Sequence, residues 1–381
     1  RLAALRERGG KLVVIDPRRT ETAKFAQRHL FIRPGTDALL LLALVRELFA
    51  RGPVRLGAIG AHCRSLDELR AAVAPYAPER VAGRVGIDEE TIRTIAKELA
   101  DAESAVVYGR VGACTQEFGG ITAWLINVLN LITGNFDRAG GVMFTKPAAD
   151  IIGVANRGVV GKGSFGRFRS RVRGLPEFGG ELPVAALAEE ILEEGPGRIR
   201  ALVTMAGNPV LSAPNGRRID EALAKLDFMV SIDPYVNETT RHADVILPPT
   251  SPLEKAHYDL ALHALAVRNT AKFSLPVFPR AAGALDDGEI ASRIVEALET
   301  ARHGAWSRPA LTAKALRLAG AERMVDVILR LGPYRGRRGP NGRGLTLARL
   351  RREPHGIDLG PLEPCMPDRL PATHRFVDLA P

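Results

Sequence analysis

The sequence is poor in cysteine and in long apolar stretches. It has 3 cysteines in 381 residues, Cys63, Cys114 and Cys365, and no CxxC pair, so residues close in sequence cannot build a zinc cage or an iron–sulfur cluster. The longest unbroken apolar run, Ala38 to Val45, is far shorter than the roughly 18 residues that a membrane-spanning helix needs. No signal-peptide pattern opens the chain. We therefore predict a protein without a membrane span and expect a cytoplasmic location.

Aromatic residues are also scarce, at 5% of the chain, although the net charge is +10. Most of the positive charge lies in two segments: residues 301–381 have 15 Lys and Arg against 7 Asp and Glu, and residues 151–180 have 6 against 1. Each segment has only three of the aromatic residues on which single-stranded bases stack. We therefore predict no nucleic-acid partner and interpret the basic segments as solvated surface.

The apolar patterns predict strands that alternate with helices. β-branched runs indicate strands, and apolar residues at helical spacing between capping and stop residues indicate helices. Such alternation is typical of an α/β fold with parallel sheets. The expected strands are 11–15, 104–108, 201–205 and 228–232, and the expected helices are one capped by Thr20 or Thr22, then 37–50, 88–99, 123–132, 183–194, 219–226 and 321–331.

Changes in composition predict how the chain divides. We expect a first α/β domain at 1–145, an irregular basic connection at 146–182, a second α/β domain at 183–300, and an Arg-, Pro- and Gly-rich linker at 301–381. The sequence begins with Arg1, inside an expected helix, rather than with Met. We therefore expect a fragment of a longer protein, with the linker leading to a domain outside it.

The two predicted domains share an internal repeat. Residues 13–30 align without a gap on residues 230–247, at a constant offset of 217, with 8 identities in 18 positions. Each copy reads as a strand, an Asp-Pro turn and a helix start. One interpretation is that Asp-Pro merely terminates a strand. The Glu-Thr pair shared after both turns favours instead two copies of one ligand-binding turn at the carboxyl end of a strand.

The chemistry of these turns suits a nucleotide. A carboxylate just past a strand, such as Asp16 or Asp233, can accept hydrogen bonds from both ribose hydroxyls. The helix that follows offers free N–H groups to a pyrophosphate, and Arg18 and Arg19 add charge-assisted bonds. The glycine fingerprint GxGxxG follows neither strand, which disfavours a nicotinamide-dependent dehydrogenase.

The motifs IDPRRTETA, LFIRPGTD, VGACTQEFGG, TGNFDRAGG, AGNP and SIDPYVNETTRHADVILPPTSPLE follow one another across roughly residues 10–270. In this order they resemble the molybdopterin-dependent oxidoreductases of the dimethyl sulfoxide reductase and formate dehydrogenase type. The resemblance implies two Rossmann-like domains related by a pseudo-twofold axis. These domains hold two molybdopterin guanine dinucleotides around one molybdenum or tungsten.

The resemblance also implies the residues of the cofactor site. Asp37 matches the position that pairs with guanine, whose N1–H and N2–H edge a carboxylate can accept; a helix N-cap is the alternative role for it. Glu117 stands where many relatives have His, so formate-specific roles are not transferred. The implied cofactor contacts are Asp16, Arg18, Thr20, Gly35, Asp37, Gln116, Gly207, Asn208, Asp233 and Thr239.

Other parts that the resemblance implies lie outside this sequence. They are the cysteines of a 4Fe-4S cluster and the metal ligand, both N-terminal to the matched region, and a C-terminal barrel. Cys114 does not match the metal-ligand position, so no metal ligand is assigned here and the catalytic residues stay unknown. The implied function is redox chemistry on a small molecule such as formate or an oxyanion, with an electron-transfer partner subunit. The alternative is a structural relative without molybdenum in an electron-transfer complex.

Overall fold

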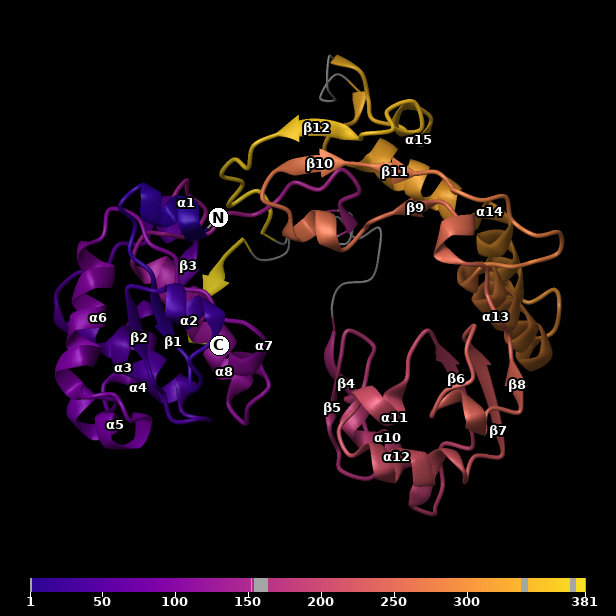
Figure 1. Cartoon of the computed structure of the whole chain (residues 1–381), viewed down its shortest axis with the longest axis horizontal. Helices are drawn as coiled ribbons and strands as arrows, with labels where there is room; N and C mark the ends of the chain where they lie inside the picture. The colour runs from indigo at the N-terminus through magenta and orange to yellow at the C-terminus, as the bar shows by residue number, and fades with distance from the viewer. Residues whose placement is uncertain (1, 152, 154–163, 337–341, 371–374, 381) are drawn as a thin grey trace. The chain divides into compact units, whose positions relative to one another are not determined.

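The computed structural model describes residues 2–151, 153, 164–336, 342–370 and 375–380. The chain forms two compact units: unit 1 combines Arg1–Thr145 with Pro361–Pro381, and unit 2 is Lys146–Gly360. Figure 1 labels the elements of both units. The fold is mixed α/β, with small parallel and small antiparallel sheets.

Helices dominate unit 1. Its two small sheets are both parallel: β1 pairs with β2, and β3 pairs with β13. The strands are β1 (Val13–Ile15), β2 (Arg28–Leu30), β3 (Cys63–Arg64) and β13 (Val377–Asp378). The helices are α1 (Leu2–Glu7), α2 (Glu21–Phe25), α3 (Asp37–Ala50), α4 (Leu66–Val73), α5 (Pro78–Val85), α6 (Glu89–Asp101), α7 (Val111–Cys114) and α8 (Gly119–Ile132), with a 3-10 turn η1 at Gly57–His62.

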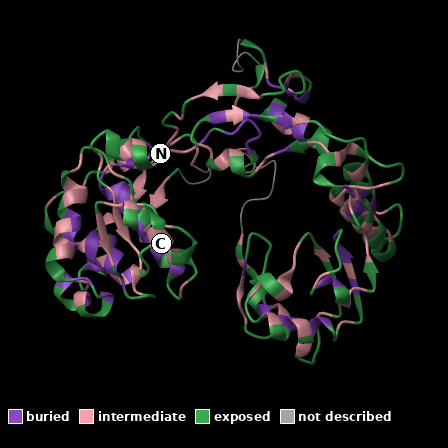
Figure 2. Ribbon diagram, viewed as in Figure 1, coloured by how far each residue is buried: buried purple, intermediate pink, exposed green. Residues whose placement is uncertain are grey.

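The core of unit 1 forms around α3. Leucines recur along this helix at helical spacing, and Leu40, Leu44 and Leu48 are buried. Figure 2 shows buried stretches, in purple, along the helices of unit 1. They belong to one cluster with Leu125 and Leu129 of α8. Burial of such side chains contributes about 1.5–3 kcal/mol each. The core therefore holds the start of α3, where the predicted Asp37 lies, in a fixed place.

The predicted strand at 104–108 is wrong. This segment is extended, but side chains of α8 and the following turn occupy its hydrogen bonds in place of a strand. The Asn130 amide accepts from Val107 N at 2.9 Å and donates to Val107 O at 2.8 Å, and Asn135 Oδ1 accepts from Ala105 N at 3.0 Å. Asn130 is buried, so its amide satisfies backbone groups that a neighbouring strand would otherwise pair.

The expected linker at 301–381 differs from the structure. Its first part contributes α14 (Arg308–Leu331), which bends at Gly320 (φ 70°), together with α15 (Leu347–Leu350) and β12 (Ile357–Gly360) of unit 2. Its last part returns to unit 1, where β13 pairs with β3 and Leu379 lies in the core with no exposed surface. Residues 361–380, as far as they are described, are thus part of the packing of unit 1.

Unit 2 contains a three-stranded parallel sheet, β6 (Ala201–Met205), β7 (Phe228–Ile232) and β8 (Val245–Ile246), in the order β6-β7-β8. A second apolar cluster contains Phe273 and Leu329. The other strands are β4 (Phe165–Arg169), β5 (Pro176–Phe178), β9 (His257–Tyr258), β10 (Asn269–Ala271), β11 (Phe273–Ser274) and β12 (Ile357–Gly360). The other helices are α10 (Leu187–Leu192), α11 (Pro209–Ser212), α12 (Gly216–Leu223), α13 (Asp287–His303) and α15 (Leu347–Leu350), with 3-10 turns η2 (Val184–Ala186), η3 (Thr240–His242), η4 (Pro252–Glu254) and η5 (Leu262–Leu265).

The expected irregular connection at 146–182 lies partly outside the described residues, at 152 and 154–163. Its described end is ordered by the hairpin of β4 and β5. The Glu177 side chain, fully buried, accepts from Arg167 N, Gly180 N and Ser164 Oγ. These hydrogen bonds, that from Ser164 above all, lower the pKa of Glu177 to about 2. A single carboxylate therefore organises this glycine-rich turn.

The internal repeat is present in the backbone. Val13 pairs with Arg28 and Val14 with His29 in unit 1, and Val230 pairs with Val245 and Ser231 with Ile246 in unit 2. Each residue of the second pair of strands lies 217 positions after its counterpart, so the two copies have the same parallel pairing and the same register. The sequence repeat is therefore also a repeat of strand, turn and returning strand.

Candidate functional site

The first copy of the turn begins where β1 ends. Asp16 Oδ1 accepts from Arg18 N at 2.7 Å, and His29 Nε2 lies 3.0 Å from the Asp16 carbonyl oxygen. Thr20 caps α2, because its Oγ1 accepts from Ala23 N at 3.2 Å. Arg18 is exposed, and the structure gives its guanidinium no hydrogen bond or ion pair with any described residue. The turn thus places a half-buried carboxylate beside an unpaired cation.

The second predicted group in unit 1 lies at the start of α3. Gly35 has φ +84°, a conformation that glycine adopts without strain. Thr36, not Asp37, is the N-cap residue, and its hydroxyl donates to Arg33 O at 2.7 Å. Asp37 is the first residue of the helix, so the N-cap role considered for it is wrong. Within the described residues its carboxylate has no hydrogen-bond or ion-pair partner.

Gln116 lies between α7 and α8. Its Nε2 donates to Gly112 O at 2.7 Å. A Cβ on Gly119 would come within 1.8 Å of Cys114 O, so glycine is required where the chain folds from one helix into the next. The structure records no hydrogen bond between Gln116 and the other predicted residues of unit 1.

The second copy of the turn repeats the geometry of the first. Asp233 Oδ1 accepts from Tyr235 N at 2.8 Å, as Asp16 accepts from Arg18 N. Asn237, the counterpart of Thr20, accepts from Thr240 N at 3.0 Å, as Thr20 accepts from Ala23 N. Asp233 is buried. The repeat thus extends from the backbone to the side chains that cap it.

The structure brings Asn208 and Thr239 together in unit 2. Thr239 has no exposed surface; its hydroxyl donates to Asn208 Oδ1 at 2.7 Å and accepts from Val210 N at 3.2 Å. Asn208 Nδ2 donates to Glu238 Oε2 at 2.8 Å. Thr22, expected to mirror Thr239, is exposed, so the two copies differ at this position. Thr239 is therefore a buried residue whose hydrogen bond fixes the orientation of the Asn208 side chain.

The left-handed residue of the turn that contains Gly207 is the residue before it. Ala206 has φ +52°, whereas Gly207 has no positive φ. A Cβ on Gly207 would meet only Met205 O, at an ordinary 3.7 Å. Neither the backbone conformation nor the neighbouring protein atoms therefore require glycine at 207.

Sequence reasoning missed Asn237 and Glu238 as members of this group. Asn237 Nδ2 lies 3.5 Å from Asp233 Oδ2, and its Oδ1 accepts from Thr239 N at 2.9 Å, so it links the two predicted residues. The offset of 217 could have indicated Asn237, because it occupies the position of the predicted Thr20. Glu238 is one of the identical residues of the repeat.

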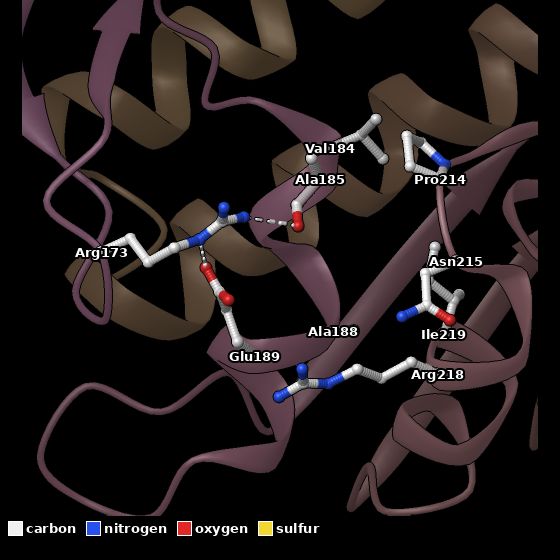
Figure 3. A pocket seen from close by; sticks show the side chains of 9 residues that line it. All are labelled: Arg173, Val184, Ala185, Ala188, Glu189, Pro214, Asn215, Arg218 and Ile219. Carbon is white, nitrogen blue, oxygen red and sulfur yellow. Dashed lines mark hydrogen bonds and ion pairs between the residues drawn. The ribbon is translucent and has the colours of Figure 1, made fainter.

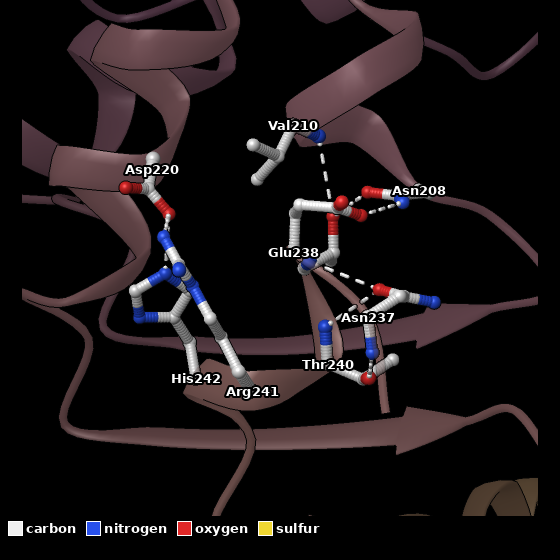
Figure 4. Close-up of polar contacts among 9 residues, drawn as sticks. Asn208, Val210, Asp220, Asn237, Glu238, Thr240, Arg241 and His242 are labelled. Atoms are coloured by element: carbon white, nitrogen blue, oxygen red, sulfur yellow. Dashed lines mark hydrogen bonds and ion pairs between the residues drawn. The ribbon is translucent and has the colours of Figure 1, made fainter. Parts of the chain in front are cut away.

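A second polar cluster joins η3 to α12. Asp220 Oδ1 lies 2.6 Å from both His242 Nε2 and the Arg241 guanidinium (Figure 4). The hydrogen bonds from His242 and Arg241 hold the pKa of Asp220 below its ordinary value of 3.8. His242 thus anchors the turn that follows the second Asp-Pro.

Asp220→Asn is expected to loosen η3 in a pH-dependent way. A lowered pKa in the folded state means that ionised Asp220 contributes stability above its ordinary value of 3.8, and that this contribution is lost as the pH falls through and below that value. The variant should therefore melt earlier than the unsubstituted chain at neutral pH, and the difference should close below about pH 4. Melting curves from pH 3 to 7 measure it; a difference that is constant over this range would contradict the role of the ionised carboxylate.

A pocket in unit 2 lies away from the predicted residues. It has a volume of about 210 Å³ and contains none of the predicted cofactor contacts. Figure 3 shows that Arg173 is occupied by Glu189 and by Ala185 O, to which it donates at 2.9 Å. The lining residues are Arg173, Val184, Ala185, Ala188, Glu189, Pro214, Asn215, Arg218 and Ile219.

The described part of the chain holds no group of three or more His, Cys, Asp or Glu side chains placed to bind a metal ion. None of the three cysteines in this part of the chain forms a disulfide; Cys114 is exposed, and Cys63 and Cys365 are half-buried. Burial raises the pKa of the Cys63 thiol. None of the helices among the described residues is both long and apolar enough to cross a membrane.

Comparison with known proteins identifies the family. Residues 2–277 match the family described as molybdopterin oxidoreductase, and the chain belongs to it. The match includes both copies of the turn and all ten predicted cofactor contacts.

The chain is similar to the F420-dependent formate dehydrogenase subunit alpha of Methanocaldococcus jannaschii, with 28% identity over 67% of this chain and 39% of that protein. It is also 31% identical to the assimilatory nitrate reductase catalytic subunit of Bacillus subtilis, over 65% of this chain and 37% of that protein. The chain thus spans less than two fifths of the length of these relatives.

A solved structure has a similar fold. The acetylene hydratase of Pelobacter acetylenicus superimposes with a TM-score of 0.64 and 20% identity, covering 83% of this chain and 47% of the hydratase. The similarity of fold extends beyond residue 277, where the family match ends, because the superposition covers a larger share of the chain.

Proposed function

We propose that this chain is the central part of an oxidoreductase catalytic subunit and holds bis-molybdopterin guanine dinucleotide with molybdenum or tungsten. The observation that carries the proposal is the duplicated turn, with Asp16 and Asp233 at the ends of equivalent strands and in the same register. A Rossmann-like, pseudo-twofold relation of the two halves belongs to the same proposal. Two equivalent turns suit a cofactor that has two equivalent nucleotides.

The residues of unit 1 fit one nucleotide half. The Arg18 and Arg19 side chains are exposed and unpaired among the described residues, so they are available to phosphates. Asp16 keeps Oδ2 for ribose hydroxyls, because only its Oδ1 bonds Arg18 N. The carboxylate of Asp37, also unpaired among the described residues, can accept the two N–H groups of a guanine edge.

The residues of unit 2 fit the other half with different chemistry. Tyr235 and Val236 replace the two arginines of the first turn, so no cation lies at the equivalent positions. Asn208 is oriented by Thr239 and Glu238. The lack of a side chain at Gly207, which neither its conformation nor its surroundings require, leaves the backbone open to close approach by a ligand.

When the cofactor is bound, its metal supplies the redox chemistry, and the protein supplies orientation and electrostatics. The proposed substrate is a small molecule such as formate or an oxyanion, in keeping with the names of the formate dehydrogenase and nitrate reductase relatives. The proposal also includes a metal ligand, a 4Fe-4S cluster and a C-terminal barrel outside this chain, an electron-transfer partner subunit, and a cytoplasmic location.

The proposal predicts the cofactor content of variants. The complete subunit, purified from a host that makes the cofactor, should contain molybdenum or tungsten and guanine-bearing pterin. We expect the metal content and the pterin content to fall in each of three variants, Asp16→Ala, Asp37→Ala and Asp233→Ala. Each substitution leaves hydrogen-bond donors of the bound cofactor without an acceptor, which costs about 1–3 kcal/mol of binding free energy. Metal analysis and fluorescence of the oxidised pterin measure the content.

Arg18→Ala should also lower the pterin content. Its matched control is Arg84→Ala, since Arg84 is likewise exposed and has no recorded partner among the described residues. Equal losses in the two arginine variants would show that total charge matters and not this turn. A subunit that contains neither metal nor pterin would instead favour the structural relative without molybdenum.

A further inference from the structure

An exposed aromatic ring lies beside the Asp16 carboxylate in unit 1. Ile15 pairs with Leu30, and Asp16 N still donates to Leu30 O at 3.1 Å beyond the end of the strands. Phe31 therefore comes opposite Asp16. Register partners in a parallel pair point to the same face, and residues two apart on one strand do so as well. Asp16, His29 and Phe31 accordingly share one face of the strand pair.

Two recorded contacts agree with this placement. The rings of His29 and Phe31 are in edge-to-face contact, with centroids 4.3 Å apart and an interplanar angle of 61°. His29 Nε2 also lies 3.0 Å from Asp16 O. His29 is half-buried and in hydrogen-bond contact with the turn. It therefore supports one side of the Phe31 ring (we call this ring braced), while the rest of that ring stays accessible.

Phe31 is 59% exposed, although its neighbour Ile32 is buried in the core of unit 1. Its neighbours are of the types that bind a nucleotide: Asp16 for hydroxyl groups, and Arg18 and Arg19 for phosphates. An aromatic face is the remaining element, since every base can stack on one. In the second copy Ile246 and Pro248 stand at the positions of His29 and Phe31, so the braced ring belongs to the first copy.

We propose that Phe31 is a stacking platform for the purine base of the nucleotide bound at the first turn, braced by His29. This inference rests on the proposed nucleotide role of unit 1 and adds a binding residue to it. The base lies against the free part of the ring, its ribose near Asp16 and its phosphates near Arg18. The base would thus lie at the end of β2, and the phosphates would lie at the turn that follows β1.

The test compares GDP with inorganic pyrophosphate as probes of the 381-residue chain, by calorimetric titration. Phe31→Ala should weaken GDP binding at least about fivefold, because stacking on one aromatic side chain contributes that much or more, and should leave pyrophosphate binding unchanged. Arg18→Ala should weaken both. Phe278→Ala is the control, since Phe278 is another exposed phenylalanine (55%), in unit 2.

Phe31→Trp keeps an aromatic face and adds a spectroscopic readout. In a background in which the exposed Trp306 is replaced by Phe, Trp124 is the other tryptophan, so the same background with Phe31 intact is the reference. GDP should quench the additional fluorescence of Phe31→Trp relative to that reference, and pyrophosphate should not. Unchanged GDP affinity in Phe31→Ala, or GDP binding without quenching in Phe31→Trp, would overturn the platform while leaving the proposed function standing. Absence of GDP binding by the unsubstituted chain would also overturn it; the metal and pterin content of the complete subunit then decides the proposed function separately.

Discussion

Leu379→Ala is expected to lower the free energy of unfolding of unit 1 by about 2–5 kcal/mol, the usual cost of emptying a fully buried leucine site. Leu379 has no exposed surface and belongs to the cluster that contains Leu44 and Leu129. Its backbone N–H is also bound, to Arg64 O at 3.1 Å. The residue therefore fills a core built by segments more than 200 positions earlier in the chain.

Ending the chain at Gly360 should have a larger effect. It removes Leu379 from the core, and it removes strand β13, which pairs with β3. It also removes the backbone N–H groups of Cys365 and Met366, which donate to Asp137 Oδ2 at 2.7 and 2.6 Å. Asp137 is buried, and a buried carboxylate that loses its donors is costly. We expect unit 1 to lose its cooperative unfolding transition.

The fluorescence of Trp124 measures both effects. Trp124 packs against the core of unit 1, and replacing the exposed Trp306 by Phe leaves it as the only tryptophan, because the chain has 2. Val111→Ala is the control, since Val111 is 66% exposed in the same unit. If a chain ending at residue 360 unfolds at the same urea concentration as the whole chain, residues 361–381 contribute nothing to the stability of unit 1, and the prediction is wrong.

Elements with strong local signals could be predicted from the sequence. The strand at β1 ends at Asp16-Pro17, and α6 begins after Asp88, whose carboxylate accepts from Thr91 N at 2.8 Å. The leucine-rich stretch predicted at 37–50 is α3. In each case the residues that start or stop the element lie within a few positions of it, so a single sequence contains the information.

Elements that depend on partners far away in the chain could not be predicted from the sequence. Val106, Val107 and Tyr108 are of residue types typical of strands, but the backbone hydrogen bonds of Val107 are made with the side chain of Asn130, 23 positions later. The tail at 361–380 is rich in proline and has one deeply buried leucine, so it shows no apolar period. Only the folded core reveals that Leu379 completes it.

The candidate site is intermediate between these cases. The repeat located Asp16 and Asp233 because both copies kept the same local turn. The repeat also predicted equivalent positions for Thr22 and Thr239, which are identical in sequence but differ in burial. The partner that makes the difference, Asn208, lies 31 positions away on another strand connection.

Thr239→Val is therefore expected to disorder the turn that carries Asn208. Valine keeps the shape of threonine but removes the hydroxyl, which leaves Asn208 Oδ1 and Val210 N without their partner. Each buried polar group left unpaired costs about 1–3 kcal/mol, and both belong to the short segment between β6 and α12. Amide hydrogen exchange over residues 206–213 should become at least about tenfold faster.

Two control variants show whether the effect comes from the loss of the hydroxyl group and whether it is specific to position 239. Thr239→Ser keeps the donor and acceptor and should retain most of the protection. Thr22→Val makes the same chemical change at the equivalent, exposed position of the first copy, where a change within about 0.5 kcal/mol is expected. If Asn208 contacts the second nucleotide half as proposed, Thr239→Val should also lower the pterin content of the complete subunit, and Thr239→Ser should restore it. Lost pterin with unchanged exchange at 206–213 would mean that Thr239 touches the cofactor directly, whereas faster exchange with full pterin content would remove Asn208 from the site.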